Sequence, residues 1–146
     1  MDTKVIALYF PQFHAIPEND DWWGKGFTDW DNVRQGYPLF AGHRQPRIPL
    51  NNNYYDLSNV ETIKWQVELA KKYNIYGFSV YHYWFDGKQL LETPQELLLH
   101  HPELDISFCL TWANETWARG WDGRDKEIVQ LQTHEPTKEK WKQHFD

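Results

Sequence analysis

Three continuous apolar runs constrain the fold of this 146-residue chain more than any other feature. They occupy residues 5–10, 77–83 and 106–112, and each has the length of a strand. An apolar run without polar alternation is typical of a strand buried on both faces, as in a parallel sheet. Helical patterns separate the runs, so the order is strand, helix, strand, helix, strand. This order predicts βαβ units with neighbouring parallel strands.

The first helical pattern has both a start signal and an apolar stripe. Ser58 and Glu61 have the spacing of a capping box. The stripe that follows is amphipathic and comprises Val60, Ile63, Val67 and Ala70. A shorter helix is predicted over residues 94–101. The single cysteine, Cys109, lies inside the third apolar run, so it is expected to be a buried structural thiol without a disulfide partner.

Two long segments do not fit a minimal βα unit. Residues 15–57 are predicted to form a loop, and residues 113–133 a second excursion, each after the carboxyl end of a predicted strand. Parallel β/α proteins build their sites from loops at that end. Residues 137–145 have the pattern of an amphipathic helix that reaches the end of the sequence.

Composition excludes several classes of function. The formal net charge is −6 and no long basic run is present, which argues against a nucleic-acid partner. No stretch has the roughly 18 apolar residues of a membrane span. The N-terminus has no signal-peptide layout, so a cytoplasmic location is expected. The GxSxG, GxGxxG and Walker patterns are absent, and no cofactor is predicted.

Aromatic and polar side chains gather where each predicted strand ends. The content of Phe, Trp and Tyr is 17%, including nine Trp. Such rings stack on the C–H faces of sugars, while amide and hydroxyl groups bind sugar hydroxyls. The strand ends therefore predict a carbohydrate site, although each residue alone could equally be core packing. The predicted substrate-binding residues are Tyr9, Gln12, His14, His82, Tyr83, Trp84, Trp112 and Asn114.

Glu115 is the predicted catalytic residue. It follows the third strand between Trp112 and Trp117, where indole rings are expected to desolvate its carboxyl group and raise its pKa. The alternative is a carboxylate that accepts a sugar hydroxyl or forms a loop salt bridge. Glycoside cleavage needs a second carboxyl group. The sequence leaves the candidates for that group open: Asp29, Asp86 and Asp122.

A metal centre is the alternative use of the histidines. His14 and His82 could meet, with Glu115 or Asp56 supplying oxygen ligands. No HxH or HExxH pair is present, so no metal site is predicted. The expected convergence of His14, His82 and Glu115 is instead attributed to a shared ligand or to bonds among the three side chains.

Several blocks of the sequence resemble the WbsX-type glycosyltransferase family of bacterial polysaccharide-cluster proteins, which is related to glycoside hydrolase family 99. The matching stretches are residues 7–14, 16–20, 22–24, 26–28 with Trp30, 32–33, 55–57, 77–78, 81–85 with 87–88, 91–92 with Pro94, 108–109, 112–115, Trp117 and 121–123. Two departures stand out. Asp29 occupies a position where the family pattern has Glu, and Asn52–Asn53 replaces Leu-Gly.

The resemblance implies a (β/α)8 TIM-type barrel that acts on O-antigen or capsule glycans. A barrel domain needs about 250 residues, so residues 1–146 are expected to be only its N-terminal β/α units, a fragment whose partner is the remainder of the barrel. In the related hydrolases the catalytic glutamates lie late in the barrel. The predicted function is glycosyl transfer or glycoside hydrolysis on a bacterial cell-surface polysaccharide. The alternative is a non-catalytic glycan-binding module.

Overall fold

Strand β2 (Gly77–Phe85) is the centre of the sheet, and the computed structural model describes residues 3–120, 123–135 and 137–145 around it. The other strands are β1 (Ile6–Tyr9), β3 (Lys88–Leu90), β4 (Ser107–Trp112), β5 (Trp117–Arg119) and β6 (Arg124–Gln130). The α-helices are α1 (Pro17–Trp23), α2 (Asp29–Gln35), α3 (Val60–Lys72), α4 (Thr93–His100) and α5 (Lys138–Phe145), with 3-10 turns at Leu50–Asn52 and Pro102–Leu104.

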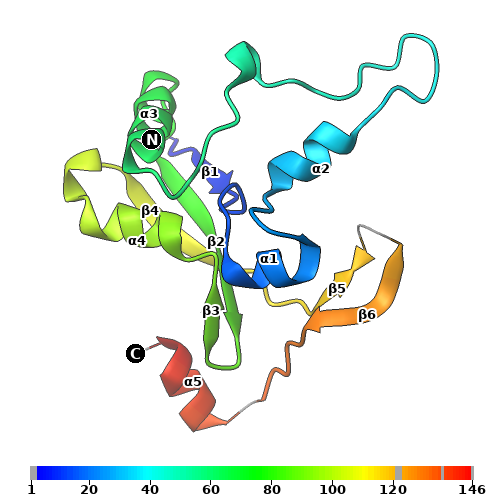
Figure 1. Ribbon diagram of the computed structural model, residues 1–146. Coiled ribbons are helices and arrows are strands. Elements are labelled where there is room, and N and C mark those ends of the chain that lie inside the picture. The colour runs from blue at the N-terminus through cyan, green and yellow to red at the C-terminus, as the bar shows by residue number, and fades with distance from the viewer. Residues whose placement is uncertain (1–2, 121–122, 136, 146) are drawn as a thin grey trace.

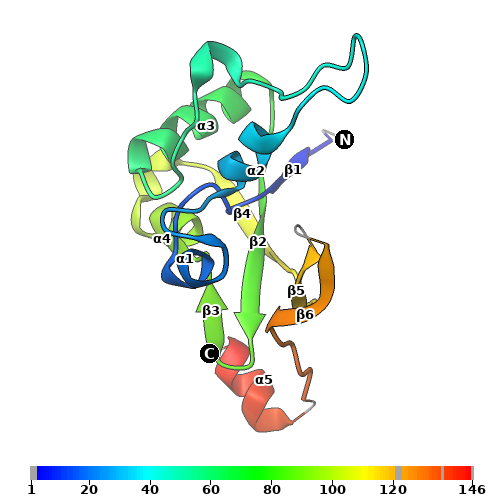
Figure 2. The same ribbon diagram turned by 45° about the vertical axis from the view of Figure 1, so that its right-hand side comes forward.

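The three predicted strands are parallel neighbours, in the order β1-β2-β4. Ile6 pairs with Gly77, and Gly77 pairs with Ser107 on its other side. The predicted parallel pairing is therefore confirmed. In Figures 1 and 2, α3 and α4 lie on one side of this sheet and the β5–β6 hairpin on the other side of β2. The larger (β/α)8 barrel stays a prediction, since the sheet formed by the described residues is open.

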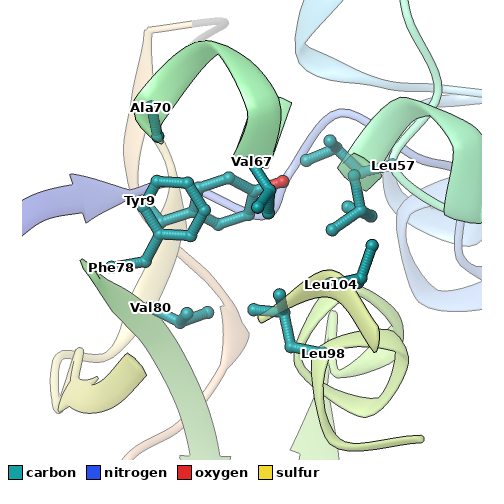
Figure 3. Packing of buried hydrophobic residues seen from close by; sticks show 9 residues of the cluster. Tyr9, Leu57, Val67, Ala70, Phe78, Val80, Leu98 and Leu104 are labelled. Carbon is teal, nitrogen blue, oxygen red and sulfur yellow. The ribbon is translucent and has the colours of Figure 1, made fainter. Parts of the chain in front are cut away.

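The main core lies between the sheet and helices α3 and α4. Figure 3 shows the rings of Tyr9 and Phe78 next to each other beneath α3, with Leu98 and Leu104 on the opposite side of the cluster. Ile63 is completely buried. Burial of an aliphatic side chain of this size contributes about 1.5–3 kcal/mol. This core holds the N-terminal halves of the strands in register, and so sets where their carboxyl ends lie.

The expectation that the outer strands are buried on both faces is wrong. Ile6 and Leu8 of β1 are 53% and 67% exposed. Cys109 of β4 is also exposed, so the predicted buried thiol is wrong as well. The register places Leu8, Ser79 and Cys109 on the same face of the sheet. Helices α3 and α4 cover the opposite face, which is why Leu8 and Cys109 reach solvent.

The N-cap of helix α3 lies one residue later than predicted. Asn59 is the N-cap, and its side-chain oxygen accepts a hydrogen bond from the Glu61 amide at 2.9 Å. The hydroxyl of Ser58 donates instead to Asp56 at 2.7 Å. The predicted Ser58 cap is therefore wrong, because a neighbouring carboxylate and a neighbouring amide compete successfully for the two roles.

The predicted long loop over residues 15–57 contains helical turns. Pro17 occupies the first turn of α1, where its missing N–H carries no penalty. A capping box between Thr28 and Asp31 starts α2. The second long segment, residues 113–133, holds the antiparallel pair β5–β6. These elements bring the long segments back against the carboxyl ends of the parallel strands.

Strand β3 was not predicted. It pairs antiparallel with the end of β2 through a tight turn at Asp86 and Gly87. Both turn residues have positive φ, 52° and 102°. Asp-Gly is the sequence that such two-residue hairpin turns prefer. The hairpin extends β2 past the sheet, and in both views α5 lies beside its tip (Figures 1 and 2).

Candidate functional site

The predicted site residues lie at the carboxyl ends of β1, β2 and β4, but they separate onto two faces. Successive side chains of a strand point to opposite sides of the sheet. In β2, Tyr83 therefore points to one side, and His82 and Trp84 point to the other. The residues after β4 continue this alternation. Two different pockets result, each lined by part of the predicted set.

The first pocket, which we name the rim pocket, has a volume of about 460 Å³. It lies on the face of the sheet that carries Tyr83. Among the predicted residues, Gln12, Tyr83 and Glu115 line it. Sequence reasoning missed further lining residues: Asn19, Trp23, Tyr81 and Trp117. A pocket of this size with aromatic walls and a few polar groups is typical of small-ligand sites.

Tyr83 is a buried polar group of the rim pocket. It is 4% exposed, and burial raises the pKa of its phenol far above the usual value. The side-chain amide of Gln12 donates a hydrogen bond to the Tyr83 oxygen at 3.1 Å. Negative charge on Asp29 and Glu115 also disfavours the phenolate. Tyr83 is therefore a neutral hydroxyl that can donate its proton in a hydrogen bond to a ligand.

Glu115 lines the rim pocket but is not enclosed by indoles. Its side chain is exposed, so the expected desolvation of this carboxyl group is wrong. The ring of Trp117 packs instead on Tyr83 and Phe85, at centroid distances of 4.9 and 5.1 Å. Trp112 points to the other face of the sheet. Glu115 can therefore accept hydrogen bonds from a ligand, but the two flanking indoles do not shield it from water.

Asp29, the first residue of α2, is a half-buried acid near the rim pocket. Burial raises its pKa to about 6. Within the described part of the chain, its Oδ2 atom has no hydrogen-bond partner. Its backbone N–H donates to the Gln12 carbonyl at 3.5 Å, and its charge acts on Tyr83. Of the open carboxyl candidates, Asp29 is thus the one beside the Gln12–Tyr83 pair.

The other two carboxyl candidates differ from Asp29. Asp86 forms an ion pair with Lys140 at 2.7 Å, and this hydrogen-bonded lysine lowers the pKa of the Asp86 carboxyl. Asp86 is therefore an ionised, paired group at the β2–β3 turn. Asp122 lies outside the described residues.

The second pocket, which we name the α5 pocket, has a volume of about 250 Å³. It lies between helix α5 and the ends of β2 and β4. Among the predicted residues, Trp84, Trp112 and Asn114 line it. The lining residues that sequence reasoning missed include Gln132, His134, Trp141 and His144. Trp141 and His144 could have been identified from the sequence, because they are three residues apart in the amphipathic pattern over 137–145 and so share a helix face.

His82 lines neither pocket, but it contacts His144, which lines the α5 pocket. Its Nε2 atom lies 3.0 Å from Nε2 of His144, and the two rings are stacked. Burial, followed by the effect of His144, lowers the pKa of His82; burial likewise lowers the pKa of His144. Trp84 stacks on His144 at a centroid distance of 4.9 Å and an angle of 7°. The histidine pair is therefore neutral at pH 7 and holds α5 against the strand end.

Tyr9 and His14 line neither pocket. Tyr9 belongs to the main core, and its hydroxyl donates to Gln66. His14 is 2% exposed, and burial lowers its pKa. Its ring nitrogens have no hydrogen-bond partner among the described side chains and backbone groups. The expected triple of His14, His82 and Glu115 is not brought together, since no pocket or hydrogen bond of the described residues joins them.

The described residues contain neither a cluster of metal ligands nor a membrane-spanning helix. Across residues 3–120, 123–135 and 137–145, no group of three or more His, Cys, Asp or Glu side chains is arranged to hold a metal ion. In the same residues, no helix combines the length and apolar character that crossing a bilayer requires. The arrangement that does exist is two adjacent pockets with aromatic and hydrogen-bonding walls.

Comparison with known proteins places the chain in a family. Two relatives from strains of Xanthomonas campestris pv. campestris, both named "Uncharacterized protein WxcX", are 48% identical to it over 134 residues. The match covers 92% of this chain but only 19% of either relative, so the chain spans about a fifth of their length. No solved structure matches it. The sequence model described as "Glycosyltransferase WbsX" matches residues 5–146, and the chain therefore belongs to the WbsX glycosyltransferase family.

Proposed function

We propose that this chain is part of an enzyme that transfers or cleaves a glycosyl unit of a bacterial cell-surface polysaccharide, such as O-antigen or capsule. The rim pocket is its proposed sugar site. Family membership supports the carbohydrate class. The observation that carries the proposal is the part-buried hydrogen bond between Gln12 and Tyr83 beside the exposed carboxylate of Glu115 in an aromatic pocket. Such a pocket offers sugar hydroxyls both a donor and an acceptor.

The proposed roles follow from the state of each side chain. Tyr83 donates its hydroxyl proton in a hydrogen bond to a sugar oxygen, because Gln12 already donates to the phenol oxygen. Glu115 accepts hydrogen bonds from sugar hydroxyls. Trp117 and Tyr81 offer rings to the apolar face of the sugar. These roles bind and orient a sugar, which is the contribution we propose for this part of the enzyme.

We also propose that the sheet belongs to a (β/α)8 barrel of which residues 1–146 form N-terminal units. The support is the parallel order β1-β2-β4 and the pocket at the carboxyl ends of the strands. Sites in such barrels lie at that end. In this proposal, the remainder of the barrel is the partner of residues 1–146. We further propose a cytoplasmic location for the enzyme.

A glycan-binding module without catalysis is the second candidate. One observation favours it: Glu115 is the only carboxyl group among the described residues that line the rim pocket. Glycoside cleavage needs two carboxyl groups across the scissile bond. Asp29 lies near the pocket, but it is not among the residues that line it.

A glycan screen on the full gene product separates these functions. Surface polysaccharide fragments are offered with and without activated sugar donors, and both binding and new reducing ends are measured. Released reducing ends identify a hydrolase, and donor-dependent extension of the glycan identifies a transferase. Binding without turnover identifies the binding module. If no fragment is bound or changed, the carbohydrate function of the rim pocket is wrong.

A further inference from the structure

We propose that the α5 pocket is a second, separate binding site that takes one uncharged sugar unit. The inference rests on the proposed function only for the class of ligand. Three elements form the walls of the α5 pocket: β2 supplies Trp84, β4 supplies Trp112 and α5 supplies Trp141. Indole rings facing one small pocket suit a ligand with flat C–H faces and polar edges. The volume of about 250 Å³ is near the lower end for ligand sites, which fits a single sugar ring.

A buried acceptor in this pocket lacks a donor. Gln132 is only 8% exposed, and within the described residues its Oε1 atom has no hydrogen-bond partner. Its backbone N–H donates to Thr116 at 3.1 Å, which fixes the residue in position. Leaving a buried amide oxygen unpaired costs stability. A sugar hydroxyl in the α5 pocket would supply the missing donor, and the neighbouring amide of Asn114 offers further hydrogen bonds.

The charges in the pocket argue against an anionic ligand. Asp86 and Glu135 line it together with a single described cation, Lys140, which pairs with Asp86 at 2.7 Å. Glu135 also acts on this lysine. The lowered pKa of His144 keeps that ring neutral at pH 7. Acidic groups therefore outnumber basic ones, and an anionic sugar such as a uronate would be repelled.

The α5 pocket is separate from the rim pocket although the two are neighbours. Four consecutive residues alternate between them: Trp112 and Asn114 line the α5 pocket, whereas Ala113 and Glu115 line the rim pocket. The two sets of lining residues have no member in common. A ligand in one pocket therefore contacts different side chains from a ligand in the other, and the two sites can be removed independently by substitution.

Binding of methyl glycosides to the full chain tests this inference. The probes are methyl α-D-glucoside, methyl α-D-mannoside, methyl α-L-rhamnoside and, as the charged comparison, methyl β-D-glucuronide. Isothermal titration and ligand-observed NMR measure affinity. We expect at least one neutral glycoside to bind more tightly than the glucuronide. Trp141→Ala should weaken that binding about tenfold by loss of ring contact, whereas Trp141→Phe should retain most of it.

Two further sets of variants keep the result decisive. Gln132→Leu removes the acceptor at similar volume. Because Gln132 lies outside α5, this variant should weaken binding without disturbing the helix, which Trp141→Ala could do. Glu68→Gln, on the exposed side of α3 and outside both pockets, should leave this affinity unchanged, and Tyr83→Phe and Glu115→Gln are compared as rim-pocket variants. The inference is overturned if no neutral glycoside binds, if the glucuronide binds best, or if rim-pocket variants lose the affinity that Gln132→Leu keeps. Loss of polysaccharide turnover in rim-pocket variants concerns the proposed function instead.

Discussion

The side-chain amide of Gln12 donates a hydrogen bond to the hydroxyl of Tyr83 at 3.1 Å, joining residues 71 positions apart. This bond connects the turn after β1 with the carboxyl end of β2. Because Tyr83 is buried, the bond both stabilises the fold and orients a hydroxyl of the rim pocket.

Gln12→Leu and Tyr83→Phe should not be additive in their effects on stability. Each removes one partner of the same hydrogen bond, so the double variant should lose less than the sum of the single losses. We expect a coupling free energy of about 0.5–1.5 kcal/mol. Urea unfolding of the wild type, both single variants and the double variant measures it. A coupling indistinguishable from zero would contradict the described bond.

Asp29→Asn should flatten the dependence of stability on pH. The pKa of Asp29 is about 6 in the folded chain because of burial. The ordinary value, which applies to the unfolded chain, is about 3.9. Between about pH 4 and pH 6 the folded state therefore holds a proton that the unfolded state has lost. A group with a raised pKa stabilises the fold while protonated, and this contribution is lost as the pH rises through that window.

The effect of Asp29 should be modest because the residue is partly exposed. After allowance for solvent screening, we expect Asp29→Asn to gain about 1 kcal/mol at pH 7 and almost nothing at pH 4. Unfolding free energies at both pH values provide the measurement. Asp21→Asn, at an exposed acid of α1, is the matched control. An equal gain for Asp29→Asn at pH 4 and pH 7 would refute the raised pKa.

Glu115→Gln should reduce the affinity of the full enzyme for its glycan more than it reduces the catalytic step. The substitution keeps the shape of an exposed pocket residue and removes its charge. Loss of a charged acceptor for sugar hydroxyls is expected to raise KM about tenfold with a small change in kcat. Steady-state kinetics test this, with Glu68→Gln on the exposed side of α3 as control. A fall in kcat at unchanged KM would assign Glu115 to the chemistry.

Gly77→Ala should destabilise the sheet at the pairing of β2 with β4. A methyl group on Gly77 would run into the backbone carbonyl of Ser107. The strands cannot separate without losing ladder hydrogen bonds, so we expect a loss of about 1–3 kcal/mol. Thermal or urea unfolding measures the loss. At Gly36 the closest atom belongs to the flexible side chain of Gln45, at 3.2 Å, so Gly36→Ala should cost less. Equal losses would contradict the close approach of β2 and β4.

The positions of the parallel strands could be predicted because long apolar runs have few alternative structures. The exposure of Leu8 and Cys109 could not be predicted in the same way. A sequence shows that a strand is apolar on both faces, but the covering of each face depends on where distant helices pack. The β2–β3 hairpin was predictable in principle, because Asp86 and Gly87 form a known turn signal.

The candidate site was predictable at the level of strand ends and not at the level of pockets. Alternation along β2 already implies that Tyr83 points away from His82 and Trp84. The sequence did not reveal that His144 of α5 would stack on His82 and Trp84, because these contacts join residues 60 or more positions apart. Nor did it reveal the exposure of Glu115, which depends on Trp117 turning toward Phe85.

The alternation of residues 112–115 between two pockets makes the length of this segment as important as its composition. Trp112 and Asn114 face one pocket, and Ala113 and Glu115 face the other. In an extended segment, one inserted or deleted residue exchanges the side chains on the two faces. Such a change would move the carboxylate of Glu115 out of the rim pocket and into the α5 pocket. Functional relatives should therefore vary here by replacing residues and keep the number of residues constant.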